Sequence, residues 1–560
     1  MGLGTLLERV RGRLERRAEA LSQGLGSTVP ARVAAPPSDP SIIALRRAVA
    51  LSPNDAGASL ALAEGLAAAG QADEAVRAAR SAAHLARRSG DQATELQACR
   101  VWAQLEPDSR EAAIALAAAL AAAGLAGEAA QAYEAVIAAH GAQVDLLIAL
   151  GSVYEEIARG DDAFAAYSRA VAIEPEHLDA LILAGIAARD AGRPEEGEAL
   201  LERALRVKPD SSHAIFNLGL LRMDRGGLDT AARDFDAVRT LRRGEPWSDA
   251  TLERLLASQR CDPRDPDWGV ARFKLEHDVE QLAYLRTVGR LGAGWDAVID
   301  EYRRAMRDPS LAEEPYRHTA LDPGRYPLLA ATYKRPLHVP DLEVPDGALV
   351  ADGLDWAEIE AGYLGSTPNM ACVDGFLTPA ALAAVRRWCL EATIWNELKN
   401  GYVGASMHDG FACPLLLRIA AQLRERMPRV IGARPLQTMW GFKYDTRFAG
   451  TTPHADEAAV NVNFWITPDE ANLDPSCGGL VVHGLEAPRD WGFRRFNADG
   501  DDARRLLSEA GSSGIRVPYR SNRALMFDSD MFHETDTFRF APGYENRRIN
   551  ITMLFGSRDR

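Results

Sequence analysis

A histidine and an aspartate stand two residues apart in TTPHADEAAVNVNFWIT, at His454 and Asp456. The run that follows alternates apolar and polar residues, which predicts a strand, and side chains two residues apart on extended chain point to one side. Imidazole and carboxylate groups are ligands for a divalent metal ion. His533, in NRALMFDSDMFH at the end of another predicted strand, supplies a third ligand. Two histidines and one carboxylate suit either non-haem Fe(II) or a zinc hydrolase.

Two further side chains distinguish these chemistries. Tyr444 ends the predicted strand before the His-x-Asp pair, and RRINITMLFG brings an arginine into the last predicted strand. A buried guanidinium is a rigid fork of donors that matches a carboxylate, so a dicarboxylate co-substrate needs it and a zinc hydrolase does not. Strand alternation places Arg548 on the same face as Asn550, and leaves Arg547 with the apolar face as a structural or surface residue.

The order Tyr, His-x-Asp, distant His and Arg resembles the 2-oxoglutarate/Fe(II)-dependent dioxygenases, in particular their prolyl 4-hydroxylase-like branch. DGFLTPAAL, near residue 374, is similar to the opening of that catalytic domain. The resemblance implies Fe(II), 2-oxoglutarate and O2 as cofactors, with ascorbate as a candidate reductant, and hydroxylation of a C–H bond. The residues implied are His454, Asp456 and His533 for metal binding and catalysis, and Arg548, Tyr444, Asn550 and Asn463 for the co-substrate.

Short strands separated by turns must position these residues. LQTMWGFKYD, AVNVNFWIT, CGGLVVHG, RALMFDSD and RRINITMLFG each read as a strand, which predicts an antiparallel sandwich or barrel. The resemblance makes this a double-stranded β-helix of the jelly-roll or cupin-like type, with flanking helices, over residues 366–560. The segment 484–514 reads as an insertion between barrel strands, and we expect it to fold over the active-site mouth and to bear on substrate choice.

Residues 40–243 show a 34-residue period in an Ala/Leu-rich, helical sequence. Gly151, Gly185 and Gly219 repeat at that spacing, as do bulky residues such as Tyr167 and Leu201. The pattern resembles tetratricopeptide repeats, which stack helical hairpins into an all-α superhelix. The concave face of such a superhelix usually holds a peptide or protein. A purely structural arm, or an arm that dimerises to give a homodimer, is the alternative.

The same His-x-Asp spacing occurs in EHLDA, at His177 and Asp179. This pair falls at the start of a predicted repeat helix, with no second histidine or strand beside it. We therefore expect a solvated helix-start pair and no metal site. Residues 1–39 read as an amphipathic helix and linker, and residues 244–365 as a connecting region of helices and irregular chain.

Composition narrows the function classes. The net charge of −15 argues against a general nucleic-acid binder, and no apolar stretch is long enough to span a membrane. The start of the chain lacks the apolar core of a signal peptide, and six scattered cysteines suit reduced thiols. We expect a cytoplasmic, bacterial protein.

Three functions follow from these observations. The leading one is hydroxylation of a protein or peptide side chain recruited by the repeats. The second is the same chemistry on a small-molecule or carrier-bound natural-product intermediate. The third, from a different class, is a non-catalytic repeat scaffold or an iron or oxygen sensor.

Overall fold

The computed structural model describes residues 40–245, 269–311, 314–489, 491, 493–497 and 500–558. They fall into two compact units, divided between Ala214 and Ile215. The predicted amphipathic segment 1–39 and part of the predicted connecting region lie outside the described residues. None of the described helices is long and apolar enough to cross a bilayer.

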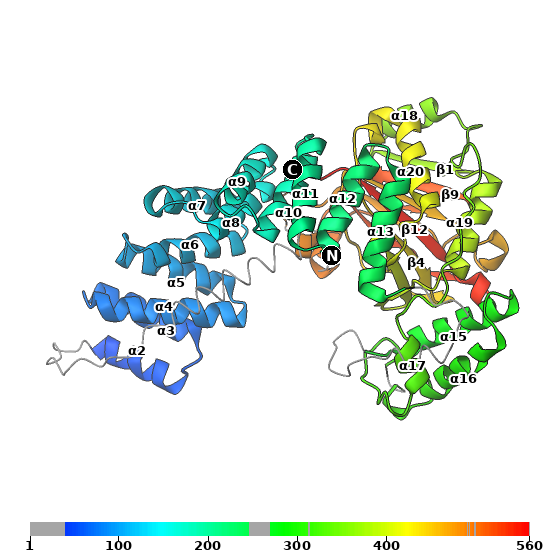
Figure 1. The fold of residues 1–560 in the computed structure, drawn as a ribbon. Helices are drawn as coiled ribbons and strands as arrows, with labels where there is room; N and C mark the ends of the chain where they lie inside the picture. The colour runs from blue at the N-terminus through cyan, green and yellow to red at the C-terminus, as the bar shows by residue number, and fades with distance from the viewer. Residues whose placement is uncertain are drawn as a thin grey trace. The chain divides into compact units, whose positions relative to one another are not determined.

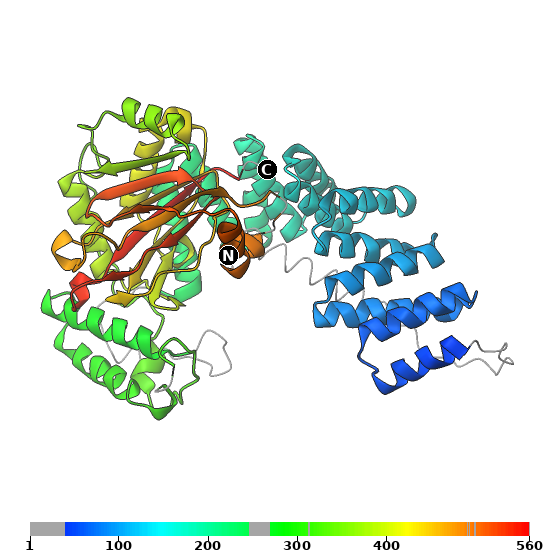
Figure 2. The same cartoon turned by 180° about the vertical axis from the view of Figure 1, so that it is seen from behind.

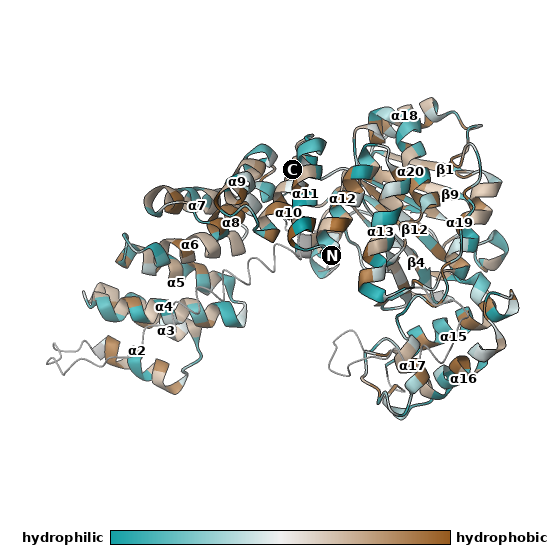
Figure 3. Cartoon of the chain, in the orientation of Figure 1, coloured by the Kyte–Doolittle hydropathy of each residue, from teal (hydrophilic) through white to brown (hydrophobic). Residues whose placement is uncertain are grey.

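The first unit is a succession of antiparallel helical hairpins (Figure 1). Its helices carry hydrophilic and hydrophobic residues side by side (Figure 3). They are α2 (Pro40–Leu51), α3 (Ala56–Ala68), α4 (Ala72–Ser89), α5 (Gln92–Leu105), α6 (Arg110–Ala122), α7 (Ala126–His140), α8 (Val144–Glu156), α9 (Gly160–Ile173), α10 (Leu178–Asp190) and α11 (Pro194–Val207). Helix α12 (Ser212–Asp224) crosses into the second unit.

The 34-residue period has a packing cause. A Cβ added at Gly185 would lie 2.7 Å from Cγ of Leu201 and 3.3 Å from the Gly197 carbonyl oxygen. One period earlier, Gly151 meets the ring of Tyr167 in the same way. The hairpins that contain Gly151 and Gly185 therefore close by seating a bulky residue of the second helix against a glycine of the first, where a Cβ would clash.

The second unit contains antiparallel β-sheets (Figure 2). The seven-stranded sheet has the order β1-β9-β6-β12-β4-β3-β2, and the order β10-β7-β8 makes a three-stranded sheet. A two-stranded ribbon pairs β11 with β5. The strands are β1 (Met370–Asp374), β2 (Glu397–Lys399), β3 (Tyr402–Ser406), β4 (Leu436–Tyr444), β5 (Arg447–Phe448), β6 (Val460–Trp465), β7 (Leu480–Glu486), β8 (Ile515–Val517), β9 (Arg523–Asp528), β10 (Met531–Thr535), β11 (Phe538–Arg539) and β12 (Ile549–Phe555).

Helices cover one face of the seven-stranded sheet, with α13, α19 and α20 in front of it in Figure 1. The helices of this unit are α13 (Leu228–Arg243), α15 (Arg272–Thr287), α16 (Asp296–Ala305), α17 (Pro327–Thr332), α18 (Trp356–Gly365), α19 (Pro379–Glu391), α20 (Pro414–Arg426), α21 (Phe493–Asn497) and α22 (Gly500–Glu509). Thr378 caps α19, since its side chain accepts a hydrogen bond from Ala381 N at 3.3 Å. The Thr-Pro pair thus opens a helix, as its sequence predicts.

Alternation along β12 separates two environments. Ile549, Ile551 and Met553 pack into the hydrophobic cluster beneath the helices. Arg548, Asn550 and Thr552 are also buried, but they face the other side of the sheet. That side and the three-stranded sheet share a second cluster containing Tyr444, Trp465, Leu480, Val482, Tyr519 and Phe538. The candidate site therefore lies between two sheets.

The last helical hairpin of the repeat pattern packs with this β-domain. Phe216 and Phe235 share the cluster that contains the sheet and its covering helices. Arg243 Nε donates to Asp409 Oδ1 at 2.9 Å. The expected boundary after residue 243 and the boundary between compact units therefore differ by one hairpin, because apolar side chains of that hairpin are buried against β-domain residues.

Candidate metal centre

His454, Asp456 and His533 converge. One ligand atom from each lies within 4.8 Å of the others, and no other such group occurs among the described residues. The backbone brings them together, since His454 and His533 form an isolated antiparallel bridge with hydrogen bonds of 3.0 and 2.8 Å. His533 belongs to β10, in the three-stranded sheet, and is not at the end of β9 as its sequence suggests.

The two imidazoles are oriented as metal ligands. Nδ1 of His454 lies 3.0 Å from the carbonyl oxygen of Thr452, and Nδ1 of His533 lies 3.0 Å from that of Met531. A carbonyl oxygen only accepts, so each Nδ1 carries the proton. Each Nε2 is left with its lone pair, and Nε2 of His533 faces Asp456 Oδ2 at 3.5 Å. Backbone carbonyls of this kind fix the tautomer and ring orientation of metal-bound histidine.

The Asp456 carboxylate is held by two amides. Asn461 Nδ2 donates to Oδ2 at 2.8 Å, and Asn497 Nδ2 donates to Oδ1 at 3.3 Å. Burial tends to raise the pKa of Asp456, but His533 and His454, whenever their rings are protonated, and the Asn497 amide outweigh it and hold the pKa below its usual range. The carboxylate is therefore ionised at neutral pH, the form that binds a cation.

His454 is ready as a neutral ligand. Loss of solvent around the ring, followed by the nearby His533 ring, lowers the pKa of His454 below 6.5. Neutral imidazole is the form that binds metal. The three residues thus offer two lone pairs and one negative charge to a single point.

Arg548 is buried without an acidic partner. Its Nε donates to the Gly478 carbonyl at 2.7 Å and its Nη2 to the Gly479 carbonyl at 3.2 Å. Nη1 is buried with no hydrogen bond, and no carboxylate of the described residues lies within salt-bridge distance. Burial lowers the pKa of Arg548, yet a guanidinium stays charged at physiological pH. The inner face therefore holds a positive charge with one guanidinium nitrogen, Nη1, that has no hydrogen-bond partner.

Aromatic residues surround this charge. The guanidinium carbon of Arg548 lies 4.7 Å from the ring centroid of Tyr444 and 5.8 Å from that of Trp465. The Tyr444 hydroxyl shares a 3.2 Å hydrogen bond with Oγ1 of Thr535, two residues after His533 in β10. Trp465 Nε1 is also buried without a partner. A hydroxyl, an indole N–H and a guanidinium N–H thus belong to side chains that lie together on this inner face.

Asn463 and Asn550 lie on the same inner face and bond to each other. Asn550 Nδ2 donates to Asn463 Oδ1 at 2.9 Å, and Thr552 Oγ1 donates to the same oxygen at 2.7 Å. Asn463 Nδ2 in turn donates to Asn461 Oδ1, beside Asp456. A chain of amides therefore runs from the Asp456 carboxylate into the sheet and ends at Asn550 Oδ1, which is buried without a donor.

Arg547 points to the opposite face. Its Nε donates to Glu280 Oε2 in α15 at 2.7 Å, and its Nη1 donates to the Tyr444 carbonyl at 3.2 Å. This arginine ties the connecting helix to the sheet edge. The alternation argument that separates it from Arg548 matches the positions of the two side chains.

Sequence reasoning missed three residues that support the site. Thr535 could have been found, because it is two residues after His533 on an alternating strand. Asn461 could also have been found, since NVNFW places it on the same face as Asn463. Asn497 carries no periodic signal, because it comes from a helix of the insertion and reaches Asp456 only in three dimensions.

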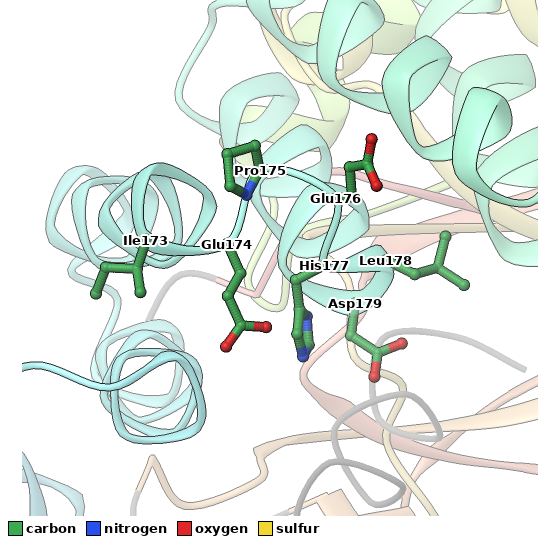
Figure 4. Close-up of a pocket in the computed structure, with 7 residues that line it drawn as sticks. All are labelled: Ile173, Glu174, Pro175, Glu176, His177, Leu178 and Asp179. Atoms are coloured by element: carbon green, nitrogen blue, oxygen red, sulfur yellow. The ribbon is translucent and has the colours of Figure 1, made fainter.

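The second His-x-Asp pair forms a helix cap. His177 is the N-cap of α10, and its Nδ1 accepts a hydrogen bond from Ala180 N at 3.2 Å. A surface hollow of about 740 Å³ lies at this turn, lined by residues 173–179 (Figure 4). The expectation of a helix-start position is confirmed, but the expectation that both residues are solvated is wrong for Asp179, which is 5% exposed.

Comparison with known proteins bears on the helical part. A family model described as tetratricopeptide repeat matches residues 158–218. Among solved structures, MamA from Desulfovibrio magneticus RS-1 is 22% identical over 30% of this chain and 94% of its own, with a TM-score of 0.29. YrrB, titled a TPR protein with an unusual peptide-binding site, is 17% identical over 35% of this chain and 92% of its own, with a TM-score of 0.25.

Pseudomonas aeruginosa PilF is 18% identical over 33% of this chain and 82% of its own, with a TM-score of 0.27. No curated protein matches this chain. The family match and the 34-residue packing period together lead to one conclusion: the chain carries tetratricopeptide repeats.

Proposed function

We propose that the second unit is a double-stranded β-helix that binds Fe(II) and 2-oxoglutarate and hydroxylates a C–H bond. The observation that carries the proposal is the convergence of His454, Asp456 and His533, with both imidazoles presenting Nε2. Two histidines and one carboxylate leave open coordination positions, which suits non-haem Fe(II). The antiparallel seven-stranded and three-stranded sheets on either side of this point support the fold assignment.

The residues beside the centre fit an anionic co-substrate. Arg548 keeps a buried donor unused, and a buried charge without a partner is costly unless something pairs with it. The distal carboxylate of 2-oxoglutarate would pair with that guanidinium, and the hydroxyls of Tyr444 and Thr535 would donate to it. The aromatic wall around Arg548 excludes water, which strengthens this pairing.

Each residue then has a defined task. His454, Asp456 and His533 would hold the metal, while Arg548, Tyr444 and Thr535 would orient the co-substrate along β10. When bound, Fe(II) and 2-oxoglutarate supply the oxidising chemistry that the protein side chains lack. The Thr452 and Met531 carbonyls keep both imidazole tautomers fixed, and Asn461 and Asn497 keep the carboxylate in place.

The proposed substrate is a protein or peptide side chain recruited by the repeats. The support is the class of the helical unit, since stacked helical hairpins form extended surfaces that bind polypeptide. A peptide array probed with the full-length wild type and with Asp456→Ala separates peptide binding by the repeats from hydroxylation at the metal centre. Peptides retained by both proteins bind the repeats, and those hydroxylated by the wild type alone are substrates.

The direct test needs no substrate. Fe(II) and 2-oxoglutarate added together without oxygen should give a visible charge-transfer band that neither gives alone. We expect Asp456→Ala to remove the band, and Arg548→Met to bind metal but to require much more 2-oxoglutarate. A folded wild-type protein that binds metal and gives no band would exclude 2-oxoglutarate as the co-substrate.

A further inference from the structure

The segment between β7 and β8 lies directly behind the metal ligands. Ala455 stands between His454 and Asp456, and Phe532 precedes His533. Because side chains alternate on extended chain, both point away from the site. Both are fully buried, in a hydrophobic cluster whose other buried members come from the inserted segment. Those members are Ala487, Trp491, Phe496, Ala503 and Leu507.

Helix α21 also bonds to the ligand segment. Ala455 N donates to the Phe496 carbonyl at 3.0 Å. The side-chain Nδ2 of Asn497 donates to the Ala455 carbonyl at 2.8 Å and to Asp456 Oδ1 at 3.3 Å. Three hydrogen bonds therefore join two residues of α21 to two residues of the His-x-Asp segment.

The two amides on Asp456 come from different elements. Asn461, which belongs to β6, donates to Oδ2, and Asn497, from the insertion, donates to Oδ1. One hydrogen bond allows a carboxylate to rotate about it, whereas one on each oxygen sets its plane. The insertion therefore supplies half of the constraint that aims this ligand.

The far end of the insertion reaches the other ligand strand. Ser512 Oγ lies 3.3 Å from Nδ1 of His483, and Nε2 of His483 lies 3.3 Å from Glu534 Oε1. Glu534 is the residue after His533 and points to the outer side of β10. The middle of the segment thus bonds directly to residues around Asp456, and its far end reaches Glu534, the neighbour of His533, through His483.

We propose that the described residues of the segment 484–514 form the supporting shell of the metal centre, with Asn497 as a positioning residue for the Asp456 carboxylate. This inference rests on the proposed metal-binding function. It gives the segment a different role from the one that its sequence predicts. The residues that sequence patterning assigns to a cover over the active-site mouth lie behind the ligands, and they set the affinity for the metal.

The role of Asn497 is tested by measuring metal affinity alone, with no co-substrate and no turnover. Co(II), an oxygen-tolerant stand-in for Fe(II), is titrated into the metal-free full chain and followed by calorimetry. Asn497→Leu keeps a side chain of similar size but removes the amide donor. We expect about 10- to 100-fold weaker binding, the usual effect of losing a group that orients a ligand.

Two variants serve as matched controls. Asn546→Leu removes an exposed amide whose Nδ2 donates to the Pro542 carbonyl, away from the triad. Arg504→Ala removes an exposed side chain of α22 that pairs with Asp501. Both should bind Co(II) as the wild type does, and thermal unfolding should show that all three variants are folded.

The outcomes separate the two proposals. Unchanged affinity in a folded Asn497→Leu variant would overturn the inference while leaving the metal site intact. Failure of the wild type to bind Co(II) or Fe(II) would overturn the proposed function, and the inference with it. Weakened binding in Asn497→Leu alone supports both.

Discussion

The His-x-Asp sequence occurs twice in this chain, and the two copies have opposite hydrogen-bond roles. At His177, Nδ1 accepts from a backbone N–H, so the neutral ring carries its proton on Nε2. At His454, Nδ1 donates to a backbone carbonyl, so Nε2 is free to bind a metal. Identical spacing therefore says little alone. The backbone that carries the pair determines the tautomer, and with it the chemistry.

The largest expected difference between the two copies is in metal affinity. Asp456→Ala removes the only carboxylate of the triad, so Co(II) or Fe(II) binding should weaken by more than the roughly 100-fold typical of outer residues. His177→Ala should leave it unchanged, because no third ligand accompanies that pair among the described residues. Calorimetric titration of both variants checks this, and equal affinities would remove the distinction between the copies.

The part of the site that lies on alternating strands could be predicted from sequence. Period-2 alternation is sufficient to place Arg548 inward and Arg547 outward, and the spacing on extended chain is sufficient to aim His454 and Asp456 together. Asn497 could not be predicted, because a short helix in an irregular segment has no period that relates it to a strand. Its contact with Asp456 arises from tertiary packing alone.

The fold shows the same division. The 34-residue period predicts the hairpins, because three successive periods repeat one glycine contact, at Gly151, Gly185 and Gly219. It cannot predict that the last hairpin packs with the β-domain, since Phe216 and Phe235 occupy ordinary repeat positions. This hairpin differs from the others in what it packs against, which is a set of apolar side chains on helices and strands far along the chain.

A third histidine–aspartate pair extends the comparison to stability. His277 is fully buried beside Asp278, with 3.0 Å between Nδ1 and Oδ1, and burial lowers the pKa of His277 to about 3. Unfolded histidine gains a proton below about pH 6.5, whereas the folded chain does not until near pH 3. Stability is therefore lost as the pH falls through this window, by about 1.4 kcal/mol per pH unit.

Urea unfolding followed by tryptophan fluorescence should show a loss of roughly 2 kcal/mol between pH 6.5 and 5. The slope should flatten in His277→Gln, because the group that takes up the proton on unfolding is gone. His140→Gln, at the exposed end of α7, is the control and should keep the wild-type slope. An unaltered slope in His277→Gln would mean that another group causes the acid sensitivity.

The helix that His177 caps is built for packing, and glycine substitutions test this. Gly185→Ala places a methyl group 2.7 Å from Leu201 and against the Gly197 carbonyl, so the repeat unit should lose about 1–2 kcal/mol of stability. Gly127→Ala meets nothing within 4 Å and should stabilise α7 slightly, through its better helix propensity. Thermal unfolding compares the two. Equal effects would show that the 34-residue glycines are not needed for hairpin closure.

The smallest effect expected is that of the cap itself. His177→Ala removes the acceptor for Ala180 N at the start of α10, which should destabilise the repeat unit by about 0.5–1 kcal/mol. His177→Asn supplies a side-chain oxygen at the same position and should recover that loss. Asparagine has no imidazole and so could not replace His177 as a metal ligand. Urea unfolding of the three proteins separates the cap from the ring. A loss that persists in His177→Asn would show that His177 acts by more than capping, and the two His-x-Asp copies would then be less different than their hydrogen bonds indicate.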